Sequence, residues 1–213
     1  MPASRLFAPV MGFVARHPPL SRMLFNAVFK AGKGPQGPNQ FLEDAIRALD
    51  PGKALDVAMG QGRNAVLLAQ LGWDVTGFDV SEQAVARAQE AARRSGVVFH
   101  AVKSTWEAFD FGSGRWDMVL LFYAWVPLSD PAFMRRLKGS LETGGVVIFE
   151  HFLHDGPGAP PKEAGSPEPG ELPALVAGFE ILRYEEVTAS PDWASPGARS
   201  RPWQLVRMIA RKS

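Results

Sequence analysis

With 213 residues, of which 46% are hydrophobic and 21% charged, the chain has the composition of a globular protein with one domain and a short extension. It contains no cysteine, which excludes disulfide frameworks, iron–sulfur clusters, thiolate zinc sites and cysteine nucleophiles. The 23 basic and 22 acidic residues give a net charge of +1, whereas a nucleic-acid-binding domain normally has a strong basic excess. We therefore expect a globular domain that does not bind nucleic acid.

One short apolar run near the start of the chain is the best candidate for a targeting signal. It extends from Leu6 to Ala15, but Pro9 interrupts it and no clear small-residue cleavage site follows. No stretch reaches the roughly 18 uninterrupted apolar residues that a membrane span needs. We therefore expect a cytoplasmic protein without stable membrane insertion. The oligomeric state stays open, a homodimer included.

Residues 1–36 differ in composition from the rest of the chain. They contain Arg and Lys but no Asp or Glu, and apolar residues recur at helical spacing from Leu20 to Phe29. One interpretation is a helical cap packed over the main domain. The other is a basic amphipathic element that touches an anionic surface or closes over a substrate. The Gly/Pro-containing segment Ala31–Gly37 leads into the main domain, which we expect to span residues 37–213.

From Pro38 onward the pattern alternates between helices and strands. Pro38 stands at the first position of a predicted helix, which Asp50-Pro51-Gly52 ends. Ser81 is the predicted N-cap of a further helix, and another helix opens at Asp130 and closes at Gly144. The segments with strand character are Ala54–Met59, Trp73–Asp79, Val97–Val102, Trp116–Tyr123, Gly145–Phe152, Phe179–Val187 and Trp203–Arg211. Strands separated by helices of this length make βαβ units, so we predict an α/β fold with a doubly wound, mostly parallel sheet.

The end of the chain departs from this alternation. Only a Pro/Gly/Ser-rich loop separates the last two strands, so they must form an antiparallel hairpin, because a parallel return needs a crossover. Upstream of the hairpin, His154–Pro173 holds six prolines and four glycines. This composition predicts a mobile loop over the sheet edge.

The most informative segment is the glycine-rich turn after the first strand. Gly60 and Gly62 follow that strand directly and precede a helix, so the backbone can approach a ligand where a side chain would clash. Asp79 ends the next strand, seventeen residues beyond Gly62. Because neighbouring parallel strands end at the same edge of a sheet, Asp79 is placed to accept hydrogen bonds from two ribose hydroxyls.

Two classes of nucleotide-binding domain carry such a turn. Gly60-x-Gly62-x-x-Ala65 fits the dinucleotide fingerprint, which leaves a NAD-type oxidoreductase open. Three features favour a different nucleotide-like ligand. Asp56 lies within the strand where dinucleotide domains usually have an apolar residue, the terminal hairpin is foreign to a plain dinucleotide fold, and no residues remain for a substrate domain.

The chain resembles the class I S-adenosylmethionine-dependent methyltransferases. Leu55–Gly62 is similar to their first motif, while Arg63-Asn64 and Pro38–Leu42 resemble the tellurite-resistance and thiopurine methyltransferase branch. The resemblance implies a Rossmann-like, seven-stranded sheet with S-adenosyl-L-methionine across the carboxyl ends of its first strands. The residues it assigns to the methionine end are Asp56, Ala58, Gly60 and Gly62, with Arg63 at the carboxylate; Asp79, followed by Val80, takes the ribose. Ala58 stands where the family usually has glycine.

Aromatic residues near the expected cofactor extend this assignment. Where the family often has an acid for the adenine, this chain offers Thr105 for a hydrogen bond and Trp106, which either stacks on the base or packs in the core. Phe122 and Tyr123 lie at the end of the fourth strand, where aromatic faces can hold the sulfonium charge. The Asn/Asp-Pro-Pro-aromatic motif of nucleic-acid amine methyltransferases is absent there, which argues against DNA as substrate.

The catalytic candidates are His151 and Tyr123. His151 ends the fifth strand and is interpreted either as a general base or as a histidine hydrogen-bonded to the neighbouring loop. His154 lies nearby, but nothing else in the sequence completes a metal site.

We expect methyl transfer to a small-molecule acceptor, with S-adenosyl-L-homocysteine as product. The alternatives are a NAD-type oxidoreductase and a non-catalytic nucleotide-binding protein whose basic N-terminal arm meets a membrane or a protein partner.

Overall fold

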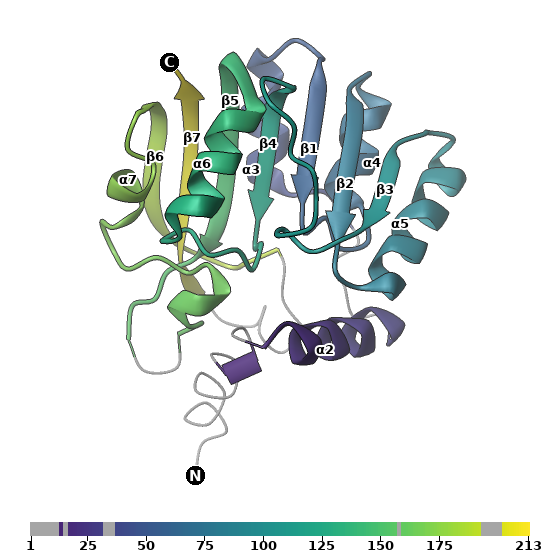
Figure 1. Cartoon of the computed structure of the whole chain (residues 1–213), viewed down its shortest axis with the longest axis horizontal. Helices are drawn as coiled ribbons and strands as arrows, with labels where there is room; N and C mark the ends of the chain where they lie inside the picture. Colours follow the sequence, from purple (N-terminus) through teal and green to yellow (C-terminus); the bar gives the residue numbers. More distant parts are fainter. Residues whose placement is uncertain (1–12, 15–16, 32–36, 157–158, 193–201) are drawn as a thin grey trace.

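A single seven-stranded sheet forms the centre of the computed structural model, which describes residues 13–14, 17–31, 37–156, 159–192 and 202–213 (Figure 1). The strands are β1 Lys53–Val57, β2 Asp74–Asp79, β3 His100–Lys103, β4 Trp116–Phe122, β5 Leu141–Phe152, β6 Phe179–Ala189 and β7 Trp203–Lys212. Their order is β3-β2-β1-β4-β5-β7-β6, and only β7 runs antiparallel to its neighbours β5 and β6. The predicted doubly wound sheet with a C-terminal antiparallel hairpin is confirmed.

Helices cover both faces of the sheet. The helices are α2 Pro18–Lys30, α3 Gln40–Ala45, α4 Arg63–Gln70, α5 Glu82–Ser95, α6 Pro131–Ser140 and α7 Leu172–Leu175, with 3₁₀ turns at Ile46–Ala48 and Lys162–Ala164. One core cluster packs α6 and α7 against the sheet, and a second packs α3 and α4 against the opposite face. Buried on both faces, β4 reads as a nearly continuous apolar run, as expected for a central parallel strand.

Two helix boundaries differ from the prediction for local reasons. Pro38 precedes α3 rather than opening it, because the side chain of Asn39 accepts a hydrogen bond from the Leu42 N–H at 3.0 Å and caps the helix. Helix α6 ends at Ser140 instead of Gly144, since Leu141 already pairs with Trp116 in the sheet. By contrast, the predicted cap at Ser81 is confirmed by its hydrogen bond from the Ala84 N–H.

The segment His154–Pro173 contains more structure than its composition predicts. It includes a 3₁₀ turn and the start of α7, and several of its residues are buried. Gly165 lies against the loop after β4: a Cβ there would be 2.6 Å from the Ala124 carbonyl oxygen. The segment is thus packed against the loop that leaves the carboxyl end of β4.

Helix α2 crosses the edge of the sheet at which the parallel strands end (Figure 1). It packs against α5, where Asn26 Oδ1 accepts a hydrogen bond from Ser81 Oγ at 2.7 Å and the Arg87 guanidinium donates to the Lys30 carbonyl oxygen at 3.3 Å. Within the described residues, this and every other helix is too short or too polar to cross a membrane.

Candidate active site

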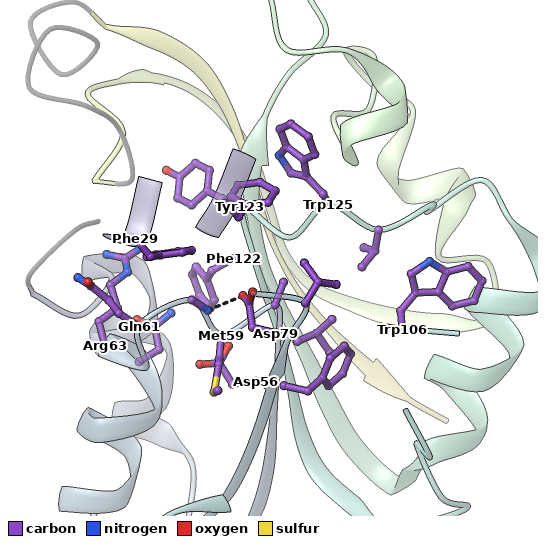
Figure 2. Close-up of a pocket in the computed structure, with 18 of the residues that line it drawn as sticks. Phe29, Asp56, Met59, Gln61, Arg63, Asp79, Trp106, Phe122, Tyr123 and Trp125 are labelled. Carbon is purple, nitrogen blue, oxygen red and sulfur yellow. Dashed lines mark hydrogen bonds between the residues drawn. The ribbon is translucent and has the colours of Figure 1, made fainter. Parts of the chain in front are cut away.

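A pocket lies at the carboxyl ends of β1, β2 and β4, beneath α2. Figure 2 shows Arg63 and Trp106 at opposite ends of this pocket, with Asp56 and Asp79 between them. The lining residues are Ser21, Phe25, Phe29, Asp56, Val57, Ala58, Met59, Gly60, Gln61, Arg63, Asn64, Phe78, Asp79, Val80, Trp106, Phe122, Tyr123, Trp125 and Val126. Most of the predicted site residues are therefore brought together; Gly62, Thr105 and His151 are not among the lining residues.

The glycine-rich turn bends tightly from β1 into α4. Ala58 has a φ of 55° and Gly60 a φ of 56°, both left-handed, so the alanine in the family's glycine position takes a conformation that is costly for an L-residue. At Gly60 a Cβ would be 3.2 Å from Phe29 Cζ, so the ring of α2 rests directly on the turn. The turn thus presents its backbone to the pocket and to the covering helix.

Gly62 lies where the start of α4 approaches α5. Its φ is 77°, and a Cβ there would be 2.9 Å from the Cβ of Ala88 on α5. This position therefore lets α4 start close to α5. That Gly62 holds the methionine end stays a prediction, and the structure adds a reason in helix packing for a glycine at this position.

Asp79 and Asp56 form the acidic centre of the pocket. Asp79 accepts hydrogen bonds from the N–H groups of Gly60 at 2.9 Å and Ser81 at 2.8 Å, and burial raises its pKa to about 6. Asp56 is 2% exposed, and its Oδ2 has no hydrogen-bond partner among the described residues. Burial, together with the charge of Asp79, raises the pKa of Asp56 to about 7, although the charge of Arg63 lowers it.

Arg63 begins α4 and joins three parts of the chain. Its guanidinium donates to both carboxylate oxygens of Asp192, at 2.9 and 3.0 Å, and to the Gly37 carbonyl oxygen at 3.1 Å. Asp192 lies between β6 and β7, and Gly37 precedes α3. The residue predicted to approach a carboxylate ligand is thus already held by a carboxylate of the chain.

Aromatic side chains line the other half of the pocket. Trp106 packs edge-on against Phe133 of α6, with ring centroids 5.4 Å apart, and it also lines the pocket; its stacking on a base stays a prediction. Trp125 packs edge-on against Phe25 of α2 at 4.8 Å. Thr105 instead accepts a hydrogen bond from the Ala108 N–H at 3.3 Å, within the turn after β3.

The hydroxyl of Tyr123 is hydrogen-bonded to a buried carboxylate. With a φ of 53°, it lines the pocket and donates a hydrogen bond from its hydroxyl to Glu150 at 2.7 Å. The buried Glu150 carboxylate also accepts hydrogen bonds from Asn39 and Arg207. Burial and the charge of Glu150 hold the pKa of Tyr123 well above its ordinary value, so this phenol stays protonated at neutral pH.

His151 is buried behind the pocket. It is 1% exposed, its Nδ1 lies 3.1 Å from Ser166 Oγ, and its ring packs near Tyr123 and Phe152. Burial lowers its pKa to about 4, so the ring is neutral at physiological pH. The geometry matches the loop-bonded interpretation of His151 rather than contact with a substrate in this pocket.

Sequence reasoning missed several lining residues. Ser21, Phe25 and Phe29 come from α2, and the only signal for them was the helical spacing of apolar residues before Ala31. No sequence pattern near Tyr123 indicated that its hydroxyl would bond to the buried Glu150. In the part of the chain that the structure describes, no group of three His, Asp or Glu residues is arranged to hold a metal ion.

Comparisons with known proteins find similarity to methyltransferases and to a bacterial hemagglutinin. Residues 54–145 match the model described as a methyltransferase domain. The chain is 39% identical, over 174 residues, to the probable S-adenosyl-L-methionine-dependent methyltransferase TehB of Haemophilus influenzae (strain 10810), which covers 79% of this chain and 60% of that protein. It is 28% identical, over 182 residues, to hemagglutinin 1 of Eikenella corrodens, which covers 80% of this chain and 58% of that protein. The chain thus spans less than two thirds of these relatives.

A solved methyltransferase structure has a fold similar to that of this chain. The Burkholderia thailandensis 1,6-didemethyltoxoflavin-N1-methyltransferase, with 1,6-didemethyltoxoflavin and S-adenosylhomocysteine bound, has a TM-score of 0.65 and 22% identity. The match covers 91% of this chain and 87% of that chain. The likeness at this identity concerns the fold and extends over most of the chain.

Proposed function

We propose that this chain, which belongs to the class I S-adenosylmethionine-dependent methyltransferases of the TehB-like branch, transfers a methyl group to a small-molecule acceptor. The observation that carries the proposal is the pairing of two buried carboxylates, Asp56 and Asp79, around a left-handed turn at one sheet edge. In this proposal residues 37–213 form the catalytic domain and residues 1–36 its N-terminal cap.

The residues present fit S-adenosylmethionine. Asp56 Oδ2 is a buried acceptor without a described partner, which suits the ammonium of the methionine end. Asp79 ends the adjacent strand and retains free lone pairs for ribose hydroxyls, and Trp106 stands at the far end for the adenine. Arg63 lies at the opposite end, where a carboxylate is expected. Ala58 is one of the lining residues, so the backbone of this turn borders the space proposed for the cofactor.

The chain's own residues supply position and exclusion of water. When bound, S-adenosylmethionine supplies an electrophilic methyl group whose leaving group is a neutral thioether. Such a reaction needs little acid–base help, which agrees with the protonated Tyr123 and the buried, neutral His151. The faces of Phe122 and Tyr123 can stabilise a sulfonium charge by about 0.5–2 kcal/mol each. Orientation under the α2 cover can contribute about 7–11 kcal/mol.

A small acceptor is favoured by the charge and by the covered pocket. The net charge of +1 offers little attraction for a nucleic-acid backbone, and residues of α2 line one side of the pocket and restrict the space for a large acceptor. The neighbour that binds 1,6-didemethyltoxoflavin has a small acceptor in the same fold. We further propose a cytoplasmic location; a homodimer stays open.

Calorimetric titration with S-adenosylhomocysteine tests the proposal. The wild-type chain should bind it, and Asp79→Asn should weaken binding by at least tenfold while its melting temperature shows that it is folded. Incubation with labelled S-adenosylmethionine and a metabolite extract should then label a small molecule. Binding of NADH but not of S-adenosylhomocysteine would favour the oxidoreductase alternative. Binding without methyl transfer, together with vesicle association through residues 1–36, would favour the non-catalytic one.

A further inference from the structure

Asp192 and Arg63 form a partly buried ion pair beside the proposed cofactor pocket, although 129 residues separate them along the chain. The Arg63 side chain is 6% exposed and the Asp192 side chain 30% exposed. The pair is bidentate: Nη1 donates to one carboxylate oxygen at 2.9 Å and Nη2 to the other at 3.0 Å. Two parallel hydrogen bonds fix both the position and the plane of a guanidinium.

The remaining donors of Arg63 lie on one edge. Gly37 takes a further hydrogen bond to Nη1, at 3.1 Å. A guanidinium carries five N–H donors, so Nε–H and the second hydrogen on Nη2 remain, and for these no partner is found among the described residues. These two donors point the same way from the guanidinium and form a second fork. A second carboxylate can therefore bind Arg63 without displacing Asp192.

Resting on the proposed function, we propose that Asp192 is a positioning residue, which holds the free fork of Arg63 ready for the carboxylate of the cofactor's methionine end. Arg63 is long and flexible, and an unpaired guanidinium would have to be ordered each time a ligand binds. Asp192 and Gly37 order it beforehand. Because Asp192 also neutralises Arg63, the ligand is held by directed hydrogen bonds rather than by net charge.

A pair of matched ligands isolates this effect. S-adenosylhomocysteine carries the carboxylate, whereas 5′-deoxy-5′-[(3-aminopropyl)thio]adenosine keeps the adenosine, thioether and ammonium but lacks it. Calorimetry on the full-length chain should show that Asp192→Asn lowers the affinity for S-adenosylhomocysteine about tenfold. Its affinity for the carboxylate-free analogue should fall less than twofold. Asp192→Glu, which retains a carboxylate, should recover part of the loss. Asp74→Asn, at the exposed opposite end of β2, is the matched control.

A mutant cycle tests whether Asp192 acts through Arg63. Arg63→Gln should also weaken S-adenosylhomocysteine selectively, and adding Asp192→Asn to it should change the affinity less than twofold. Tighter or unchanged binding of S-adenosylhomocysteine by Asp192→Asn would overturn the inference. So would an equal loss for both ligands, which indicates a merely structural role. If the wild-type chain binds neither ligand, the proposed function fails together with the inference. If the wild-type chain binds both ligands, but Asp192→Asn leaves the ratio of their affinities unchanged, the inference alone is overturned.

Discussion

Asp56, the last residue but one of β1, and Asp79, the last residue of β2, lie at the same edge of the sheet, and the charge of Asp79 contributes to the raised pKa of Asp56. Asp56 has a pKa of about 7 in the folded chain, against an ordinary value of 3.8. The folded state therefore binds a proton more tightly than the unfolded state does. As the pH rises from about 4 to 7, the unfolded chain loses this proton first, so Asp56 lowers the stability of the folded state progressively over that window.

The first prediction is that Asp56→Asn changes the pH dependence of stability. Relative to wild type, the variant should gain stability between pH 4 and pH 7, by up to a few kcal/mol, because each pKa unit corresponds to about 1.4 kcal/mol. Urea unfolding at several pH values measures the gain, and any constant effect of the amide cancels in the difference. A difference between Asp56→Asn and wild type that stays flat from pH 4 to pH 8 would contradict the raised pKa.

The second prediction separates the two glycines of the turn. Gly62→Ala should destabilise the fold by about 2–4 kcal/mol, because it adds left-handed strain and a close contact with Ala88. Gly60→Ala meets only the edge of the Phe29 ring, so its cost should be about 1–2 kcal/mol. Gly60→Ala should instead weaken S-adenosylhomocysteine binding, because it disturbs the turn and its cover. Denaturant unfolding measures the loss of stability, and calorimetry measures the loss of affinity for S-adenosylhomocysteine. Equal destabilisation by the two variants would contradict the prediction.

The third prediction concerns Tyr123. Tyr123→Phe removes a buried hydrogen bond to Glu150, which should lower stability by about 1–3 kcal/mol. The rate of methyl transfer to the acceptor identified in the labelled extract should stay within threefold, and its pH profile should not move. A general base would instead contribute a factor of about 10²–10⁴. A loss of that size in a folded variant would return Tyr123 to the catalytic role.

The fold was largely predictable because its signals are local. Each signal is carried by residues close together in the sequence: the alternation of helix and strand patterns, the cap at Ser81 and the absence of a crossover helix before β7. Together they predict the sheet. The site was predictable where strand ends carry it, as at Asp56 and Asp79, because strand direction fixes the edge at which they meet.

The remaining site features depend on contacts between distant segments. The pairing of Arg63 with Asp192 and that of Tyr123 with Glu150 leave no periodic trace in the sequence. Gly62 has the residue type of a ligand-binding glycine, but its space is limited by Ala88 on another helix. Such roles follow only from three-dimensional packing, which tertiary structure decides and local pattern does not.

The last prediction concerns the hydrogen bond that ties α2 to α5. Asn26 Oδ1 accepts this bond from Ser81 Oγ at 2.7 Å, while Phe25 and Phe29 of the same helix line the pocket. Asn26→Ala should therefore loosen the cover and speed the dissociation of S-adenosylhomocysteine about 2–10-fold, since one hydrogen bond is worth about 0.5–1.5 kcal/mol. Stopped-flow displacement measures this rate. Asn26→Asp retains an acceptor oxygen and should dissociate at nearly the wild-type rate. If Asn26→Ala released the ligand no faster than Asn26→Asp, α2 would be a fixed wall of the pocket and not a cover that opens.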